Sequence, residues 1–296
     1  MQATTWPAID DARRANGAAR LPFFIQDAGR PRAAGSVARA HLPALARWQS
    51  VLQVADHGLT LHCPAADRVA LLGEINQRLR ADGLIVAWRD ESFAVPALDD
   101  GHLLATFERA ASRFWGTLTF GAHCNGYLAD ADGRPSHLWI AQRAFTKPTD
   151  PGLLDNLVGG GVPHGQSPAA CVVREGWEEA GLTPVQMAGL LPGRRLRVAR
   201  DIPEGFQLEE VSAYDLALPA GLVPQNQDGE VHSITCMPVA EALARAAAGE
   251  MTVDASLVTL DFALRHQLLP AADAAALAAR AAPLWQGPSR LDGDTP

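Results

Sequence analysis

A cluster of glutamates is the part of this sequence whose residue types and spacing could do chemistry. Glu175, Glu178 and Glu179 are close enough in sequence that, on an α-helix with about 100° between residues, their side chains share one face. Carboxylates that crowd one face repel each other unless a cation lies among them. Because Mg²⁺ prefers oxygen ligands and often binds carboxylates together with substrate phosphates, the cluster indicates a metal site that acts on a phosphate compound.

The residues around the cluster predict a helix that follows Ser167 and stops at Gly181. Ser167 is a suitable N-cap, and Pro168 occupies the first helical position, where a missing N–H group leaves no helical hydrogen bond unmade. Glycine is the usual residue at a helix C-terminus. Arg174 lies one turn before Glu178 and can orient its carboxylate. A solvated acidic helix end is the alternative interpretation of this pattern.

The segment that contains this helix resembles the Nudix box, G-x5-E-x7-R-E-U-x-E-E-x-G-U, in which U is aliphatic. Two positions depart from it: Gln166 replaces the first Glu, and Gly176 replaces the first aliphatic residue. The amide of Gln166 can form hydrogen bonds but carries no charge, so we expect a weaker metal site there. The residues that match at the family's spacing are Gly160, Arg174, Glu175, Glu178, Glu179, Gly181 and Leu182.

The resemblance implies an α/β fold, the Nudix α/β/α sandwich with a mixed sheet, and Mg²⁺- or Mn²⁺-dependent cleavage of a diphosphate by water. Many members draw a further Glu from a later loop as metal ligand or base. Glu230 is our candidate for that role, and Glu209 and Glu210 are the alternatives. The resemblance thus assigns metal binding and catalysis to Glu175, Glu178, Glu179 and Glu230, with Arg174 as a further catalytic residue.

A narrower resemblance covers most of the chain. The runs at 119–127, 139–143 and 154–161 are similar to the Nudix part of fungal thiamine pyrophosphokinase fusions. Free-standing relatives of that branch resemble hydrolases that convert thiamine diphosphate, or its damaged oxo and oxy analogues, to the monophosphate. The resemblance therefore implies this substrate. The alternatives are a hydrolase of nucleoside-diphosphate-linked compounds such as ADP-ribose, a non-catalytic Nudix-like binding module and, through Cys124, an isopentenyl diphosphate isomerase.

A diphosphate needs basic or N–H donors besides a metal, and several residues could supply them. Arg143 and Lys147 precede the glycine run at 159–161. His123 and Asn125 alternate on a strand-like run, so both side chains point the same way, into a cleft or into the core. The candidate substrate-binding residues are therefore Arg143, Lys147, Gly160, Gly161, His123, Asn125 and Gln166. Trp115, Trp139 and Tyr127 could stack on a heterocycle or pack in the core.

Composition limits the partners. The chain has 296 residues, and 25 Lys and Arg against 33 Asp and Glu give a net charge of −8. This balance argues against nucleic-acid binding and against binding to anionic membranes. No apolar run reaches the roughly 18 residues of a membrane span, and the first residues do not resemble a secretory signal. We expect a cytoplasmic protein with a small diphosphate as partner. Dimers are common among Nudix enzymes, so a homodimer is an open alternative.

The hydrophobic pattern changes near residue 112. The first part predicts helices at 7–18, 66–81 and 103–114 and a strand at 84–88, which together suggest a small α+β domain that caps the cleft. The second part predicts the alternating strands and helices of the Nudix sandwich. The expected units are an N-terminal extension at 1–112, the Nudix domain at 113–285 and a flexible tail at 286–296.

Overall fold

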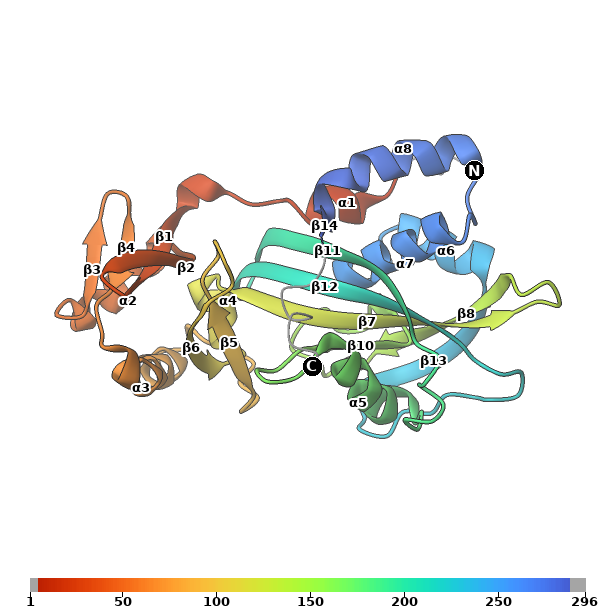
Figure 1. The fold of residues 1–296 in the computed structure, drawn as a ribbon, viewed down its shortest axis with the longest axis horizontal. Helices are drawn as coiled ribbons and strands as arrows, with labels where there is room; N and C mark the ends of the chain where they lie inside the picture. The colour runs from red at the N-terminus through yellow and green to blue at the C-terminus, as the bar shows by residue number, and fades with distance from the viewer. Residues whose placement is uncertain (1–4, 288–296) are drawn as a thin grey trace.

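The computed structural model describes residues 5–287 and has the mixed α/β fold that the sequence predicts (Figure 1). A curved sheet with helices on both faces occupies one end of the longest axis, and a smaller α+β region occupies the other end. Within the described residues, no helix is both long enough and apolar enough to cross a bilayer.

The large sheet has eight strands and is mixed. Its main order is β13-β8-β7-β12-β11-β14, with β10 paired to β7 and β9 paired to β8. The central pair β7–β12 is parallel, and the other pairs are antiparallel. The strands are β7 (Leu118–Ala129), β8 (Pro135–Arg143), β9 (Leu154–Asp155), β10 (Val158–Gly161), β11 (Leu191–Ile202), β12 (Gly205–Ala217), β13 (Val231–Pro238) and β14 (Trp285–Gln286).

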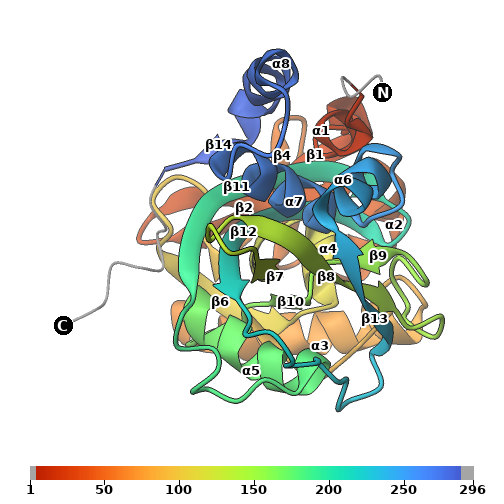
Figure 2. The ribbon, with the colours of Figure 1, turned by 90° about the vertical axis from the view of Figure 1, so that its right-hand side faces the viewer.

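Helices cover both faces of this sheet, which makes it an α/β/α sandwich (Figure 2). Helix α5 (Pro168–Ala180) lies on one side, and α6 (Val239–Ala247), α7 (Val253–Arg265) and α8 (Ala271–Ala281) lie on the other. Each side has its own apolar core. Cys171 and Val172 of α5 belong to one core, and Leu257 and Phe262 of α7 belong to the other.

The smaller region contains a four-stranded sheet of order β2-β1-β4-β3, a two-stranded sheet β5-β6 and helix α3. Its core joins Phe23, Leu72 and Trp115. Its elements are β1 (Arg20–Asp27), β2 (Arg30–Ala38), α2 (Leu42–Leu45), β3 (Leu52–Ala55), β4 (Gly58–Leu61), α3 (Arg68–Ala81), β5 (Ser92–Pro96), β6 (Leu103–Glu108) and α4 (Ala111–Trp115). Short 3₁₀ turns lie at Gly17–Ala19, Arg39–His41, Ala46–Trp48, Ala65–Asp67 and Ala282–Leu284.

Several elements of this region differ from the sequence prediction. The predicted helix at 103–114 is strand β6 followed by the short helix α4, because 103–108 pairs with β5. The predicted strand at 84–88 has no regular structure. The predicted helix at 7–18 is only α1 (Pro7–Asp11). At the other end of the chain, Gln286 pairs with Arg195, and 288–296 of the predicted tail lie outside the described residues.

The start of the chain packs against the helices of the large sheet rather than against the smaller region. Trp6 is 1% exposed, and its Nε1 donates a hydrogen bond to the carbonyl oxygen of Ser256 in α7 over 3.2 Å. Ala8, Ile9 and Ala12 belong to the same core as α7. Residues 6–12 therefore join the core of the large sheet, although β1 to β6 lie between them and β7 in sequence.

We predict that Trp6→Ala destabilises the whole chain, because it removes a fully buried indole and its hydrogen bond to α7. The free energy of unfolding should fall by about 3–5 kcal/mol, measured by urea denaturation. Trp177, which is 51% exposed, provides the control, since Trp177→Ala removes an indole that is already largely in water. Equal losses in the two variants would show that the start of the chain does not contribute to this core.

Candidate active site

Helix α5 carries the glutamate cluster, and its two ends form as predicted. The Ser167 hydroxyl accepts a hydrogen bond from the N–H group of Ala170 over 3.2 Å, and Gly181 adopts a left-handed conformation with φ 65°. Glu175, Glu178 and Glu179 all line a pocket between α5, β10 and the N-terminal region. We call this space, lined by these three glutamates together with Glu230, the glutamate pocket.

Strand β10 approaches α5 closely because it contains three consecutive glycines. The N–H group of Gly159 donates to Glu179 Oε2 over 2.8 Å. A Cβ atom at Gly160 would collide with the carboxylate of Glu175. Glycine at position 160 therefore leaves the space that the Glu175 carboxylate occupies against the strand, which gives this glycine a steric role.

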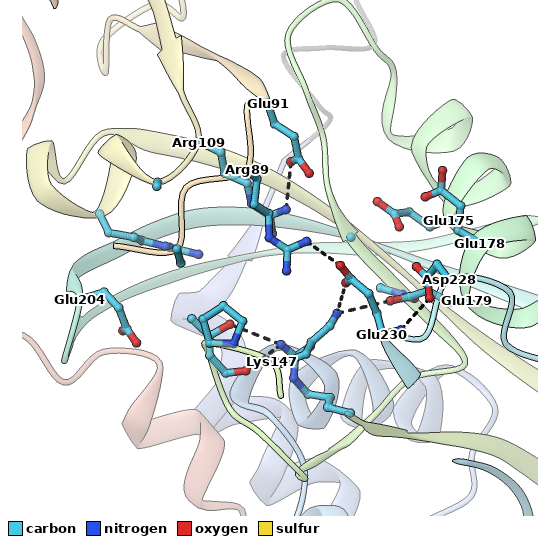
Figure 3. Close-up of a pocket in the computed structure, with 18 of the residues that line it drawn as sticks. Arg89, Glu91, Arg109, Lys147, Glu175, Glu178, Glu179, Glu204, Asp228 and Glu230 are labelled. Atoms are coloured by element: carbon cyan, nitrogen blue, oxygen red, sulfur yellow. Dashed lines mark hydrogen bonds and ion pairs between the residues drawn. The ribbon is translucent and has the colours of Figure 1, made fainter. Parts of the chain in front are cut away.

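Two cations from the chain each contact two of the four carboxylates. Arg174 donates to Glu175 Oε1 and to Glu178 Oε2, each over 2.7 Å. The Lys147 ammonium forms an ion pair with Glu230 and lies 3.8 Å from Glu179 Oε1, as Figure 3 shows. Glu230, from the loop that precedes β13, therefore joins the three glutamates of α5 in the same pocket.

Burial changes the protonation of this cluster. Desolvation raises the pKa of Glu179 to about 8, although Lys147 and the Gly159 N–H group act in the opposite direction. Desolvation also raises the pKa of Glu175, against the effect of Arg174. For Glu230, burial alone would raise the pKa, but the hydrogen bond and charge of Lys147, together with Arg89, outweigh it and lower the pKa. Buried carboxylates of this kind gain from a further positive charge.

The donor set fits a hard divalent cation, because buried carboxylate oxygens are the ligands that Mg²⁺ and Mn²⁺ prefer. In residues 5–287, no three His, Cys, Asp or Glu side chains converge tightly enough to enclose a metal ion. Arg174 and Lys147 each join two carboxylates instead. Glu175, Glu178, Glu179 and Glu230 are the residues that would hold a metal ion, and Lys147 would then give up its two carboxylate partners.

The other predicted substrate contacts fall into two groups. Gly160 and Arg143 line the glutamate pocket, but Arg143 already donates to Asp155 Oδ2 over 2.9 Å and to backbone oxygens. Gln166 and Asn125 line neither the glutamate pocket nor a second pocket that adjoins it around Gln207, Glu209 and Asp254. Gln166 Oε1 is buried without a hydrogen-bond partner among the described residues.

His123 and Asn125 point the same way, as strand alternation requires, and both contact Asn156. His123 Nδ1 lies 3.0 Å from Asn156 Oδ1, and Asn156 Nδ2 donates to Asn125 Oδ1 over 2.9 Å. Asn125 also donates to Asp215 Oδ1 over 3.2 Å. Asn125 is thus part of a buried polar network that joins β7 to α7, whereas His123 also reaches a pocket, as does Gly161.

The remaining candidates lie elsewhere. Glu209 accepts from Arg113 over 3.0 Å, whereas Glu210 pairs with Arg195 and lines neither pocket. Cys124 is fully buried, which raises the pKa of its thiol. Trp115, Trp139 and Tyr127 are core residues, so none of them faces a bound heterocycle in these pockets.

The sequence analysis missed the residues that the N-terminal region contributes. Arg89 donates to Glu230 Oε1 over 2.9 Å, and Arg109 donates to Glu91 Oε2 over 3.0 Å (Figure 3). The side chains from the N-terminal region that line the glutamate pocket include Arg89, Glu91, Arg109 and Arg113, the last of which belongs to α4. No motif marks them, because they become neighbours of α5 only through the packing of the two regions.

Comparisons with known proteins match two families along the chain. Residues 121–256 match the family described as NUDIX domain, and residues 8–119 match the one described as Domain of unknown function (DUF4743). The chain therefore contains a Nudix domain, preceded by a DUF4743 region.

Its relatives include proteins named as Nudix hydrolases. It is 36% identical to Nudix hydrolase 20, chloroplastic, of Arabidopsis thaliana over 206 residues, covering 68% of this chain and 53% of that protein. It is also 36% identical to Nudix hydrolase 24, chloroplastic, of the same plant over 209 residues, covering 69% and 55%. The chain thus spans about half the length of these relatives. Among solved structures, DR0079 of Deinococcus radiodurans is similar with a TM-score of 0.44 and 20% identity, covering 58% of this chain and 99% of that one.

We predict that, in the metal-free protein, the Tm of Glu179→Gln increases relative to the Tm of the wild type as the pH is raised. A carboxyl whose pKa is raised from 4.5 to about 8 by folding keeps its proton in the native state while the unfolded state releases it. The wild type should therefore lose stability between about pH 5 and pH 8, and the variant should lack that loss. The measurement is the Tm in EDTA across this range.

Glu241→Gln, at an exposed position of α6, controls for the change of residue type. Addition of Mg²⁺ should raise the Tm of the wild type at pH 8 more than that of Glu179→Gln. Parallel Tm curves for the wild type and Glu179→Gln, with and without Mg²⁺, would contradict the role of this buried carboxylate.

Proposed function

We propose that this chain is a Mg²⁺- or Mn²⁺-dependent diphosphate hydrolase of the Nudix type. The observation that carries the proposal is the gathering of Glu175, Glu178, Glu179 and Glu230 in one pocket whose other wall holds arginines. A binding-only domain would have no use for a cluster of carboxylates that repel each other. The relatives named as Nudix hydrolases support the same activity.

In this proposal Glu175, Glu178, Glu179 and Glu230 would hold the cation, whose chemistry would be to neutralise charge on the phosphate oxygens and to polarise the attacking water. Arg174 orients Glu175 and Glu178 through its two hydrogen bonds. Arg89 and Arg109 face the cluster from the N-terminal region and meet the diphosphate from that side. Among the candidates Glu209, Glu210 and Glu230, only Glu230 lines the glutamate pocket, which supports it as the metal ligand or base.

Glu230 suits the role of metal ligand because its carboxylate stays ionised. Lys147 and Arg89 lower its pKa despite burial, so it carries a negative charge at neutral pH. Lys147, which the sequence suggested as a phosphate donor, contacts carboxylates in the structure. We propose that it exchanges these carboxylates for the diphosphate when the metal binds.

For the substrate we propose thiamine diphosphate or its oxidised analogues, with the monophosphate and inorganic phosphate as products. The support is the resemblance of the runs at 119–127, 139–143 and 154–161 to the Nudix part of the fungal fusions. ADP-ribose-type compounds are the competing substrate class. The net charge of −8 supports a small-molecule partner over nucleic acid.

The test is product analysis with purified protein and Mg²⁺ on thiamine diphosphate, its oxo and oxy analogues, ADP-ribose and nucleoside triphosphates. We expect the thiamine compounds to give monophosphate plus phosphate. Cleavage of ADP-ribose or nucleotides instead would keep the hydrolase and overturn the thiamine substrate. Absence of cleavage with both Mg²⁺ and Mn²⁺ would overturn the hydrolase and favour a binding module.

We predict that Glu178→Gln and Glu179→Gln each lower kcat on the order of 10²-fold or more while the circular dichroism spectrum stays unchanged. Each change removes a charge from the proposed metal site and keeps the shape of the side chain. Glu241→Gln is again the matched control and should retain the wild-type rate. Undiminished turnover in both site variants would rule out this carboxylate cluster as the catalytic centre.

A further inference from the structure

A second pocket adjoins the glutamate pocket and is lined from strands β10 and β12 and the first turn of α7. The two pockets share Arg109, Arg143, Gly159 and Gly160, so one ligand can extend from one into the other. We call the second space, around Gln207, Glu209 and Asp254, the head-group pocket. It is lined by six carboxylates and four arginines, and the imidazole of His123 is its one aromatic ring.

Gln207 organises the carboxylates of the head-group pocket. Its Nε2 donates to Glu209 Oε2 and to Asp254 Oδ2, each over 2.9 Å. Its Oε1 accepts from Arg200 over 2.7 Å, which fixes the orientation of the amide. One amide therefore holds two carboxylates side by side on the same wall.

These carboxylates differ in how well they are neutralised. Glu209 also accepts from Arg113, and Asp155 accepts from Arg143 over 2.9 Å. Asp254 forms no ion pair within residues 5–287, and its Oδ1 is buried without a hydrogen-bond partner there. Asp254 is therefore a carboxylate in this pocket that makes no ion-pair contact among the described residues and has one oxygen without a partner. Burial, together with the charge of Glu209, raises the pKa of Asp254, and these effects outweigh the nearby charges of His123 and Arg200 and the hydrogen bond from Gln207.

Helix capping does not explain why a carboxylate with an unpartnered oxygen lies at position 254, in the first turn of α7. Thr252 already caps this helix, because its hydroxyl accepts from the N–H group of Ala255 over 3.2 Å. Asp273 occupies the first turn of α8 in the same way and lines neither pocket. An unpartnered buried carboxylate oxygen is costly, so it points to a ligand that donates to it.

We propose that the head-group pocket binds the non-phosphate end of the substrate and selects a positively charged head that carries a nitrogen heterocycle whose N–H group donates a hydrogen bond to Asp254. Arg113 adds a donor on the same wall, since its Nη1 is also buried without a partner among the described residues. A heterocycle with both a donor and an acceptor nitrogen satisfies the two groups. This inference rests on the proposed function, because it places the diphosphate in the glutamate pocket.

The head-group pocket can be tested without hydrolysis. Thiamine, which lacks phosphate, should bind the wild-type protein in isothermal titration calorimetry. Asp254→Asn should weaken that binding by about 10- to 100-fold, as expected for loss of a charged hydrogen bond. Asp273→Asn is the matched control and should bind as the wild type does. Asp254→Ser, which suits a helix N-terminus, serves as a second variant with the same expected loss.

A kinetic measurement adds a readout that a structural defect would not move. The two substrates are thiamine diphosphate and ethyl diphosphate, whose head is neutral and apolar. The ratio of their kcat/KM values, thiamine diphosphate over ethyl diphosphate, should fall about 10-fold or more in Asp254→Asn. The fall should come from a higher KM for thiamine diphosphate. Equal losses on both substrates would overturn the head-group proposal.

The outcomes separate the two proposals. If the wild type cleaves diphosphates but does not bind thiamine, or binds it equally well in Asp254→Asn, the head-group proposal is wrong and the hydrolase stands. If the wild type cleaves none of the compounds but binds thiamine in a manner that depends on Asp254, the hydrolase is wrong and the head-group pocket stands.

Discussion

The contact between helix α5 and the glycine strand β10 is the constraint on which the site depends. Glu179 accepts a hydrogen bond from the N–H group of Gly159, and Gly160 leaves the space that the carboxylate of Glu175 occupies. This contact takes negative charge out of water, so the surrounding structure must supply positive charge. Lys147 and Arg174 do so in the structure described here. Pairing with β7 holds β10 in place in the large sheet.

The N-terminal region completes the cavity rather than merely preceding it. Arg89 bonds directly to Glu230, and Arg113 bonds to Glu209 in the adjoining pocket. Both pockets are therefore composite, with acidic groups mainly from the Nudix domain and arginines from both parts. A diphosphate hydrolase built in this way would combine the carboxylate cluster of α5 with arginines from its N-terminal region.

The parts of the molecule that could be predicted from sequence are those whose signals are local. Ser167, Pro168 and Gly181 define α5 within one short segment, and the Nudix resemblance places its glutamates. By contrast, 103–108 was expected to be helical and is strand β6, because pairing with β5 outweighs the local pattern. Arg89 and Lys147 meet the cluster through long-range packing, which no spacing in the sequence reveals.

The packing of Trp6 against α7 also affects how the chain can fold during its synthesis. Trp6 emerges from the ribosome 250 residues before Ser256, to which it bonds. At about 5–20 residues per second, its binding surface is absent for roughly 10 to 50 seconds. During that interval Trp6 and Ile9 are exposed apolar groups, to which chaperones can bind. The core that they complete can close only after α7 has been synthesised.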